Sequence, residues 1–362
     1  MIENIIIENY KSIKHLELEL KKINILIGSN GVGKSNFISF LEMINAIYYQ
    51  RFGSYTLERG GIDNLLYFGR KQSPYIKGLI DFNNTNAFFI TLRPSQSNKG
   101  FIEETGDYFN GYNDKKKKYK NWNVTYWDRA VEESDISNNR KWRAAYLKND
   151  LESFIVYHFH DTTRSSAMKQ PCNISDNQYL RENGSNLAAL LYLLSQNNPK
   201  VFKMIEGVIR SVAPFFERFD LKPDKLNPQM IQLEWKEKES DMYFNGYNLS
   251  DGTLRFIALT TLLMQPEPPE VIIIDEPELG LHPAAINKLA ALIRKASAKS
   301  QLIVSTQSPN LVNQFEPEDV VVVDRKENQS VFNRLDKEKL SSWLEDYTLG
   351  DLWEKNVIGG QP

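Results

Sequence analysis

Residues 28–35 of this 362-residue chain read GSNGVGKS and fit the pattern G-x-x-x-x-G-K-[ST]. A short aliphatic run before this segment is typical of a buried strand, and apolar residues after it recur at helical spacing. The two sets are Ile23, Ile25, Leu26 and Ile27, and then Phe37, Leu41, Ile44 and Tyr48. Because a strand leads into the segment and a helix leaves it, the context predicts a phosphate-binding loop.

The residue types in this loop suit a triphosphate. Glycines let backbone N–H groups turn inward around phosphate oxygens, and the helix N-terminus adds partial positive charge. We expect Lys34 to reach the β- and γ-phosphates and the hydroxyl of Ser35 to ligate Mg²⁺. The residues of this segment expected to bind the nucleotide are Asn30, Gly31, Gly33, Lys34, Ser35 and Asn36.

Composition narrows the class of protein. A hydrophobic content of 41% and a charged content of 25% are ordinary for a globular chain, and the net charge of −2 leaves no overall basic character. Any contact with nucleic acid is therefore expected to be local or to come from a partner. The single cysteine, Cys172, excludes an intrachain disulfide, and no stretch has the length of a membrane span. We expect a cytoplasmic protein without a membrane anchor.

The N-terminal part alternates in the manner of β-strands. Residues 5–20 predict two strands joined by a turn at residues 9–12, and residues 79–82 and 87–92 predict a hairpin. Between them, residues 51–75 are polar and glycine-rich, and we expect them to be mostly loop.

Residues 94–150 show little periodicity. The run Lys115, Lys116, Lys117 and Lys118 lies among tyrosines and tryptophans, a mixture that can hold a single nucleic-acid strand by phosphate contacts and base stacking. Acidic residues nearby dilute this charge, which favours the alternative of a solvated insertion whose aromatic residues pack beneath it. DNA binding by this segment therefore stays one of two interpretations.

Residues 154–159 predict a strand that places His158 and His160 on one face, followed by Asp161. Such a group can ligate a metal, but no third nitrogen or sulfur ligand lies nearby, which favours a structural or nucleotide-pocket role. Helices are expected over residues 187–194 and 201–212, and residues 231–235 alternate as a strand.

The second set of site residues lies in the C-terminal part. Residues 249–253, LSDGT, precede a helix expected over 254–264. Residues 271–274 predict a buried parallel strand that ends in Asp275 and Glu276. Asp275 suits Mg²⁺ beside Ser35, and Glu276 could orient or deprotonate the attacking water.

The remaining elements alternate between helix and strand. A helix is expected around residues 286–293, and strands are expected at 302–304 and 320–323. The strand at 302–304 runs into Ser305 and, two residues later, Gln307. After Leu335 the tail has the pattern of an amphipathic helix.

Taken in order, these segments resemble the head of an ABC-type ATPase. More narrowly they resemble the RecF/SMC/OLD-like branch, with its small AAA15-type ATPases of bacteria. The resemblance rests on the phosphate loop, residues 249–252, residues 274–278 with 281–283, residues 305–308, and the opening segment 6–13. It covers about residues 1–45 and 245–325. The implied fold class is α/β: a P-loop NTPase head of ABC/SMC type with a mixed sheet, flanking helices and an inserted α+β or helical region.

The resemblance implies a mechanism in which ATP and Mg²⁺ lie between two heads. The loop of one chain would face Ser250 and Gly252 of the other, and residues 278–282 would cross the interface. Lys34, Glu276 and Gln307 would be the catalytic residues. Two departures matter: Asp251 stands where many relatives carry glycine, and Gln307 stands at the switch position where histidine is usual. Because glutamine cannot carry charge, slow turnover is a hypothesis.

Three segments are expected: 1–93 and 231–362 as the two parts of the head, and 94–230 as the inserted lobe. The function implied by the resemblance is an ATP-driven, dimerising switch that acts on DNA or on a separately encoded nuclease or effector, as in phage defence or DNA maintenance. The alternatives are the ATP-binding subunit of a membrane transporter and an OLD-type nuclease. The nuclease alternative is disfavoured because the chain ends soon after Val323, without room for a further catalytic domain.

Overall fold

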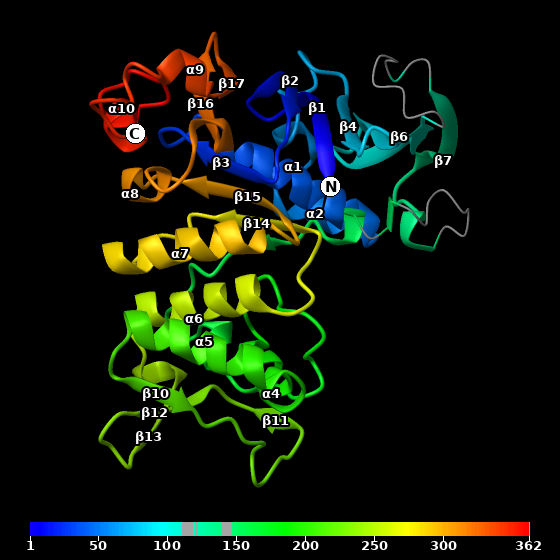
Figure 1. Cartoon of the computed structure of the whole chain (residues 1–362). Coiled ribbons are helices and arrows are strands. Elements are labelled where there is room, and N and C mark those ends of the chain that lie inside the picture. Colours follow the sequence, from blue (N-terminus) through cyan, green and yellow to red (C-terminus); the bar gives the residue numbers. More distant parts are fainter. Residues whose placement is uncertain (111–118, 120–121, 139–146, 149, 362) are drawn as a thin grey trace.

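The computed structural model describes residues 1–110, 119, 122–138, 147–148 and 150–361 (Figure 1). The lysine run at 115–118 lies outside the described residues. Layers of sheet and helix succeed one another in Figure 1, from the N-terminal sheet with β1 and β4, through α1 and the sheet with β3 and β15, to helices α7, α6 and α5. The phosphate loop belongs to the middle of this stack.

The central sheet is six-stranded, in the order β17-β16-β3-β15-β14-β8. Neighbouring strands pair in parallel from β16 to β8, and β17 is antiparallel to β16. The strands are β3 (Ile23–Ile27), β8 (Val156–Tyr157), β14 (Val271–Asp275), β15 (Gln301–Thr306), β16 (Val320–Lys326) and β17 (Gln329–Arg334). Because the strands are parallel, the carboxyl ends of β3, β14 and β15 lie at one edge of the sheet, where open α/β sheets place ligands.

A second six-stranded sheet, in the order β2-β1-β4-β5-β6-β7, is antiparallel throughout. Its strands are β1 (Ile2–Tyr10), β2 (Ile13–Glu19), β4 (Ile76–Phe82), β5 (Asn86–Pro94), β6 (Gly100–Phe109) and β7 (Asn123–Val131). The two predicted strands within residues 5–20 and the predicted hairpin are confirmed. Two further strands, β6 and β7, follow this hairpin in the same sheet.

Helix α1 (Lys34–Tyr48) lies between the two sheets and is buried along most of its length. One core joins its apolar residues to the N-terminal sheet and to Leu26, Ile273 and Ile303 of the central sheet. The opposite face of the central sheet contributes Ile25 and Val304 to a second core. The central strands are apolar throughout because both of their faces are covered.

The second core belongs to the helical part of the chain. Its helices are α4 (Leu187–Asn197), α5 (Pro199–Val212), α6 (Asp251–Met264), α7 (Pro283–Ala296) and α8 (Pro309–Val312). A small sheet at the far end has the order β10-β12-β13, with β10 (Phe216–Phe219), β12 (Glu234–Glu237) and β13 (Tyr243–Asn245), and β9 (Cys172–Asn173) pairs with β11 (Met230–Ile231). The helices predicted at 187–194, 201–212, 254–264 and 286–293 are confirmed.

Four expectations need correction. Residues 51–75 are not mostly loop, because helix α2 (Phe52–Glu58) lies there and its apolar residues Phe52 and Tyr55 are buried. The strand expected over 154–159 reduces to β8, and the strand expected over 231–235 divides between β11 and β12 in different sheets. The tail forms two short helices, α9 (Lys337–Leu340) and α10 (Leu349–Glu354), in place of one amphipathic helix.

Within the described part of the chain, no helix combines the length and apolar character that crossing a bilayer requires. The division at residues 93 and 230 stays a prediction.

Candidate functional site

The phosphate loop connects β3 to α1. At two positions in this loop there is no room for a side chain. Gly28 and Gly33 adopt positive φ angles of 152° and 121°. A Cβ on Gly28 would lie 2.3 Å from the carbonyl oxygen of Val323, and one on Gly33 would lie 2.1 Å from Oγ of Ser330. The glycines of the sequence pattern are therefore required by close packing against β16 and β17 as well as by the turn.

Lys34 is 5% exposed, and its amino group donates hydrogen bonds to the carbonyls of Gly28 (2.5 Å) and Ser29 (3.0 Å). Burial lowers the pKa of Lys34, while the carboxylates of Glu276 and Asp275 oppose this shift. The lysine is thus held within its own loop and within electrostatic reach of the acidic residues that end β14. Among the described residues its side-chain hydrogen bonds go to neutral carbonyls, and no carboxylate forms an ion pair with it.

Two serines that the sequence analysis did not single out as site residues support the loop from outside. The hydroxyls of Ser12 and Ser330 lie 2.6 Å apart, and Asn36 donates to Oγ of Ser12 at 2.7 Å. Ser330 in turn donates to the carbonyl of Val32 at 2.5 Å. The contact joins residues that lie far apart in the sequence, and local patterns carry no signal for it.

The positions of the acidic residues at the end of β14 are determined by the pairing of β14 with β15. Asp275 lies opposite Ser305 in the parallel register, and the hydroxyl of Ser305 donates to the carboxylate of Asp275. Glu276 adopts a φ of 43°, and its N–H donates to the carbonyl of Ser305 at 3.0 Å. A non-glycine residue rarely adopts this conformation, and residues held in it cluster at functional sites.

The segment after β15 bonds the same acids. The side-chain amide of Gln307 donates to the carboxylate of Glu276, and its backbone N–H donates to Oε1 of Glu278 at 2.8 Å. The hydroxyl of Thr306 donates to the same Oε1 at 2.6 Å. Burial raises the pKa of Glu278 despite these bonds. Its second oxygen, Oε2, is buried without a hydrogen-bond partner among the described residues.

Ser250 lies at the surface and caps α6, where its hydroxyl accepts a hydrogen bond from the N–H of Thr253 at 3.2 Å. Gly252 packs on the segment that follows Glu278, since a Cβ added to it would lie 2.2 Å from the carbonyl oxygen of Gly280. Arg255, on the first turns of the same helix, donates to the carbonyl of Phe159 at 2.9 Å. These contacts connect residues 249–253 with both the acid-rich segment and the end of β8.

His158, His160 and Asp161, for which the sequence favoured a structural or nucleotide-pocket role over metal ligation, bond separate partners. Among the residues that the structure describes, no three histidine, cysteine or acidic side chains are placed to share a metal ion. His160 bonds the backbone carbonyl of Asp275 at 2.8 Å, and Asp161 accepts from Thr163. His158 bonds Glu42 at 3.0 Å instead. The two histidines therefore attach the end of β8 to β14 and to α1.

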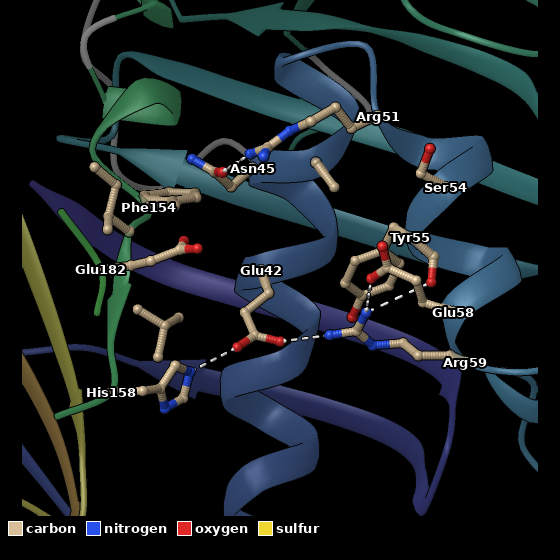
Figure 2. Close-up of a pocket in the computed structure, with 13 residues that line it drawn as sticks. Glu42, Asn45, Arg51, Ser54, Tyr55, Glu58, Arg59, Phe154, His158 and Glu182 are labelled. Atoms are coloured by element: carbon tan, nitrogen blue, oxygen red, sulfur yellow. Dashed lines mark hydrogen bonds and ion pairs between the residues drawn. The ribbon is translucent and has the colours of Figure 1, made fainter. Parts of the chain in front are cut away.

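Figure 2 shows this second attachment, in which Glu42 of α1 lies between His158 and Arg59. The Arg59 guanidinium is 3.1 Å from Glu42 and stacks 3.6 Å from the ring centroid of Tyr55. The group lines a pocket of about 230 Å³. Burial alone would raise the pKa of Glu42, but the hydrogen bond from His158 and the nearby positive charges outweigh it and lower the pKa. The bond to Glu42 raises the pKa of His158.

The geometry fits a magnesium nucleotide. The exposed Gly31 has no atom within 4 Å of the position that its Cβ would take, so the surface of the loop is open there. Ser35 is exposed at the first turn of α1, and Asp275 supplies a carboxylate, an oxygen donor set of the kind Mg²⁺ prefers. Mg²⁺ in such sites is completed by phosphates and water, so a cluster of three protein ligands is not required.

Residues 23–313 match a protein family described as "AAA domain, putative AbiEii toxin, Type IV TA system". A segment of 101 residues, 25% of the chain, is 31% identical to ABC transporter A family member 11 of Dictyostelium discoideum, of which it spans 12%. The chain therefore covers only a small part of that relative's length.

Two solved structures resemble the whole chain. The Smc head bound to the C-winged helix domain of ScpA has a TM-score of 0.60 at 16% identity, over 94% of this chain and 99% of that one. The Smc head with an extended coiled coil, bound to the C-terminal domain of ScpA from Pyrococcus furiosus, has a TM-score of 0.58 at 16% identity, over 95% and 98%. Because the family match extends over most of the sequence, the chain belongs to this AAA-domain family, and it has the fold of an SMC head.

Proposed function

We propose that this protein binds and hydrolyses ATP and that it is a switch which dimerises around the nucleotide. One observation carries the proposal: the buried ammonium of Lys34 lies within electrostatic reach of Asp275 and Glu276 at the carboxyl edge of a parallel sheet. This arrangement supports a site in which Lys34 binds phosphate, Asp275 binds Mg²⁺ and Glu276 is the base.

Each residue has a part in the proposed reaction. Backbone N–H groups of residues 28–35 and the ammonium of Lys34 would hold the β- and γ-phosphates, and Ser35 and Asp275 would hold the metal. The metal, when bound, neutralises charge on the phosphates. Glu276 accepts a proton from the attacking water, and Gln307, bonded to Glu276, orients that carboxylate.

The proposal of a dimer rests on the position of residues 249–253. Ser250 is exposed at the N-terminus of α6, a place that favours an anion, and Gly252 packs on Gly280. Within the described part of the chain, residues 249–253 form no hydrogen bond or ion pair with the phosphate loop of their own chain. A second copy would therefore supply the loop that they complete.

The proposed output is a change of association that regulates DNA or a separately encoded effector or nuclease, in the setting of phage defence or DNA maintenance. The likeness to SMC heads supports such a regulatory switch over a transporter subunit. That likeness extends over nearly the whole chain, whereas the match to the transporter spans a quarter of the chain. Both of these Smc heads are bound to a domain of the protein ScpA, which supports a protein partner for this head too.

The test is to measure ATP turnover by the purified full chain in the presence of Mg²⁺, with phosphate release as the readout. The Lys34→Ala variant should lose turnover by about 100-fold or more, since it removes a preorganised charge at the phosphates. The matched control is Lys14→Ala, which changes an exposed lysine on β2. Turnover in Lys34→Ala equal to that of the control would overturn the assignment.

A further inference from the structure

Asp251 brings a negative charge to the segment from which the dimer is proposed. It is the first residue of α6, between Ser250 and Gly252, and its side chain is 66% exposed. A carboxylate at a helix N-terminus is stabilised by the partial positive charge there, but it repels any other anion that approaches the same place. If a triphosphate is to bind at this end of α6, a positive charge has to offset Asp251.

A buried lysine from a distant part of the chain lies beside this carboxylate. The amino group of Lys169 is 3.7 Å from Oδ1 of Asp251, and it donates a hydrogen bond to the carbonyl of Thr162 at 2.5 Å. The lysine side chain is only 7% exposed, which is unusual for this residue type. Among the described residues, no other basic group forms an ion pair with Asp251. The pair therefore joins an enclosed cation to an exposed anion.

The position of Lys169 is fixed by contacts of its backbone and of its aliphatic stem. Its N–H donates to the carbonyl of Ser166 at 3.0 Å, and its carbonyl accepts from the side-chain amide of Gln232 at 3.0 Å. Gly246 packs directly on the lysine, since a Cβ added to this glycine would lie 3.4 Å from Cα and 3.5 Å from Cγ of Lys169. The ammonium is thereby held near Asp251 before any ligand arrives.

The other buried cation at this end of α6 uses its hydrogen bonds elsewhere. The guanidinium of Arg255 donates to the carbonyl of Phe159 at 2.9 Å and to that of His160 at 3.2 Å. Arg255 therefore attaches the helix to the segment that follows β8. Lys169, and not Arg255, is the group whose charge pairs with Asp251.

We propose that Lys169 is a positioning residue for the second copy's triphosphate. Its ammonium offsets the charge of Asp251, so that the surface formed by Ser250 and Gly252 is neutral instead of anionic when the phosphates approach. The inference rests on the proposed function and adds to it a residue that lies outside residues 249–253. Because each copy of a two-fold dimer presents one such surface, the loss of Lys169 acts twice in every dimer.

The proposal predicts that the stability of the dimer follows the summed charge of the pair. The test is the dissociation constant of the dimer that Glu276→Gln forms in Mg²⁺ and ATP, measured by analytical ultracentrifugation. In that background, Lys169→Met leaves a net negative pair and should weaken the dimer by about tenfold or more, since like charges then face each other. Asp251→Asn leaves a net positive pair and should tighten the dimer. Lys169→Met/Asp251→Asn is neutral again and should regain the affinity of the unchanged pair.

The matched control is Lys222→Met in the same background. Lys222 also pairs with an aspartate, Asp220 at 2.9 Å, but it follows β10 in the small sheet at the far end of the molecule. This variant should leave the dissociation constant unchanged. The melting temperature of every variant, measured without nucleotide, shows that the chain is folded before the dimer is compared.

A purely structural role for Lys169 predicts a different pattern. Both chains that carry Lys169→Met would then form equally weak dimers, and Asp251→Asn would not restore the affinity; this result would overturn the inference alone. If Lys169→Met does not fold, Asp251→Asn still decides, because Asp251 is exposed: a dimer that is no tighter overturns the inference. A Glu276→Gln chain with the pair unchanged that stays monomeric in ATP would instead overturn the proposed dimer, and this inference with it.

Discussion

The side-chain amide of Gln307 donates a hydrogen bond to the carboxylate of Glu276, across the boundary between the segments that follow β15 and β14. Gln307 is also fixed through its backbone, which donates to Glu278 at 2.8 Å. The candidate base and the candidate switch residue therefore form one unit. The amide orients Glu276 but brings no positive charge to the γ-phosphate, because glutamine does not titrate.

We expect Gln307→His to hydrolyse ATP about tenfold faster than the wild type. An imidazolium can donate to the carboxylate and also stabilise charge that develops on the phosphate. The measurement is kcat for phosphate release at saturating ATP, with Gln196→His, an exposed position on α4, as the control. A kcat that is unchanged or lower would count against the hypothesis that Gln307 slows this enzyme.

Glu276→Gln should keep ATP bound and reduce hydrolysis by about 100-fold or more, since it removes the proton acceptor while retaining size and hydrogen bonding. With ATP and Mg²⁺ present, light scattering after size exclusion should then show a dimer. Glu267→Gln, at an exposed position in the loop before β14, is the control. A variant that binds ATP but remains monomeric would contradict the two-head arrangement, or would require a partner protein in place of the second copy.

The phosphate loop, the acids after β14 and the residues after β15 could be predicted from the sequence because each is a local pattern at a strand end. Residues 28–35 and 271–276 carry their own signals of apolar run, glycine and acid. Parallel pairing then brings Asp275 opposite Ser305. The carboxyl ends of these strands lie at one edge of the sheet because the strands are parallel.

The supports of the site could not be predicted, because they join residues that are distant in sequence. The contacts of Ser12 with Ser330 and of Glu42 with His158 depend on how the two sheets enclose α1. Helix α2 was missed because its glycine and polar residues resemble a loop, while burial of Phe52 and Tyr55 against the N-terminal sheet stabilises it. Tertiary packing here outweighs local propensity.

The pair of Glu42 and His158 should make stability depend on pH. The pKa of His158 is raised, so its contribution is complete below the unfolded pKa and is lost as pH rises through the folded pKa. The pKa of Glu42 is lowered, so its contribution is present above its unfolded pKa and is lost as pH falls through the folded one. The pair therefore stabilises the fold most between the two unfolded pKa values, 4.5 for Glu42 and 6.5 for His158.

Glu42→Gln should reduce the free energy of unfolding by about 1 kcal/mol at pH 6, a small loss because the pair is partly exposed. The reduction should be smaller at pH 9, because the contribution of His158 is lost as the pH rises. Arg59 stays charged at both values and leaves a residual loss. Urea unfolding at the two pH values measures this. The control is Glu8→Gln, which removes a more exposed histidine contact, with His15 at 4.0 Å. An equal loss at both pH values would contradict the role of His158.

Gly33 and Gly31 offer a matched pair for the phosphate loop. Both have positive φ angles, of 121° and 78°, so an alanine at either position strains the backbone. Only Gly33 is also crowded, because its Cβ would lie 2.1 Å from Oγ of Ser330 and 2.9 Å from Oγ of Ser12. Gly31→Ala should therefore weaken nucleotide binding modestly, while Gly33→Ala should abolish it and lower the melting temperature.

Removing the obstructing hydroxyl tests the cause of this difference. In Gly33→Ala/Ser330→Ala the Oγ contact is absent, and part of the lost melting temperature should return, although the strain at φ 121° remains. Ser330→Ala alone loses its bonds to Val32 and Ser12, and it sets the baseline for that comparison. If the double variant melts no higher than Gly33→Ala, the hydroxyl of Ser330 is not the reason that glycine is required here, and the backbone angle and the remaining contacts with Cβ of Ser330 (2.8 Å) and Oγ of Ser12 (2.9 Å) are.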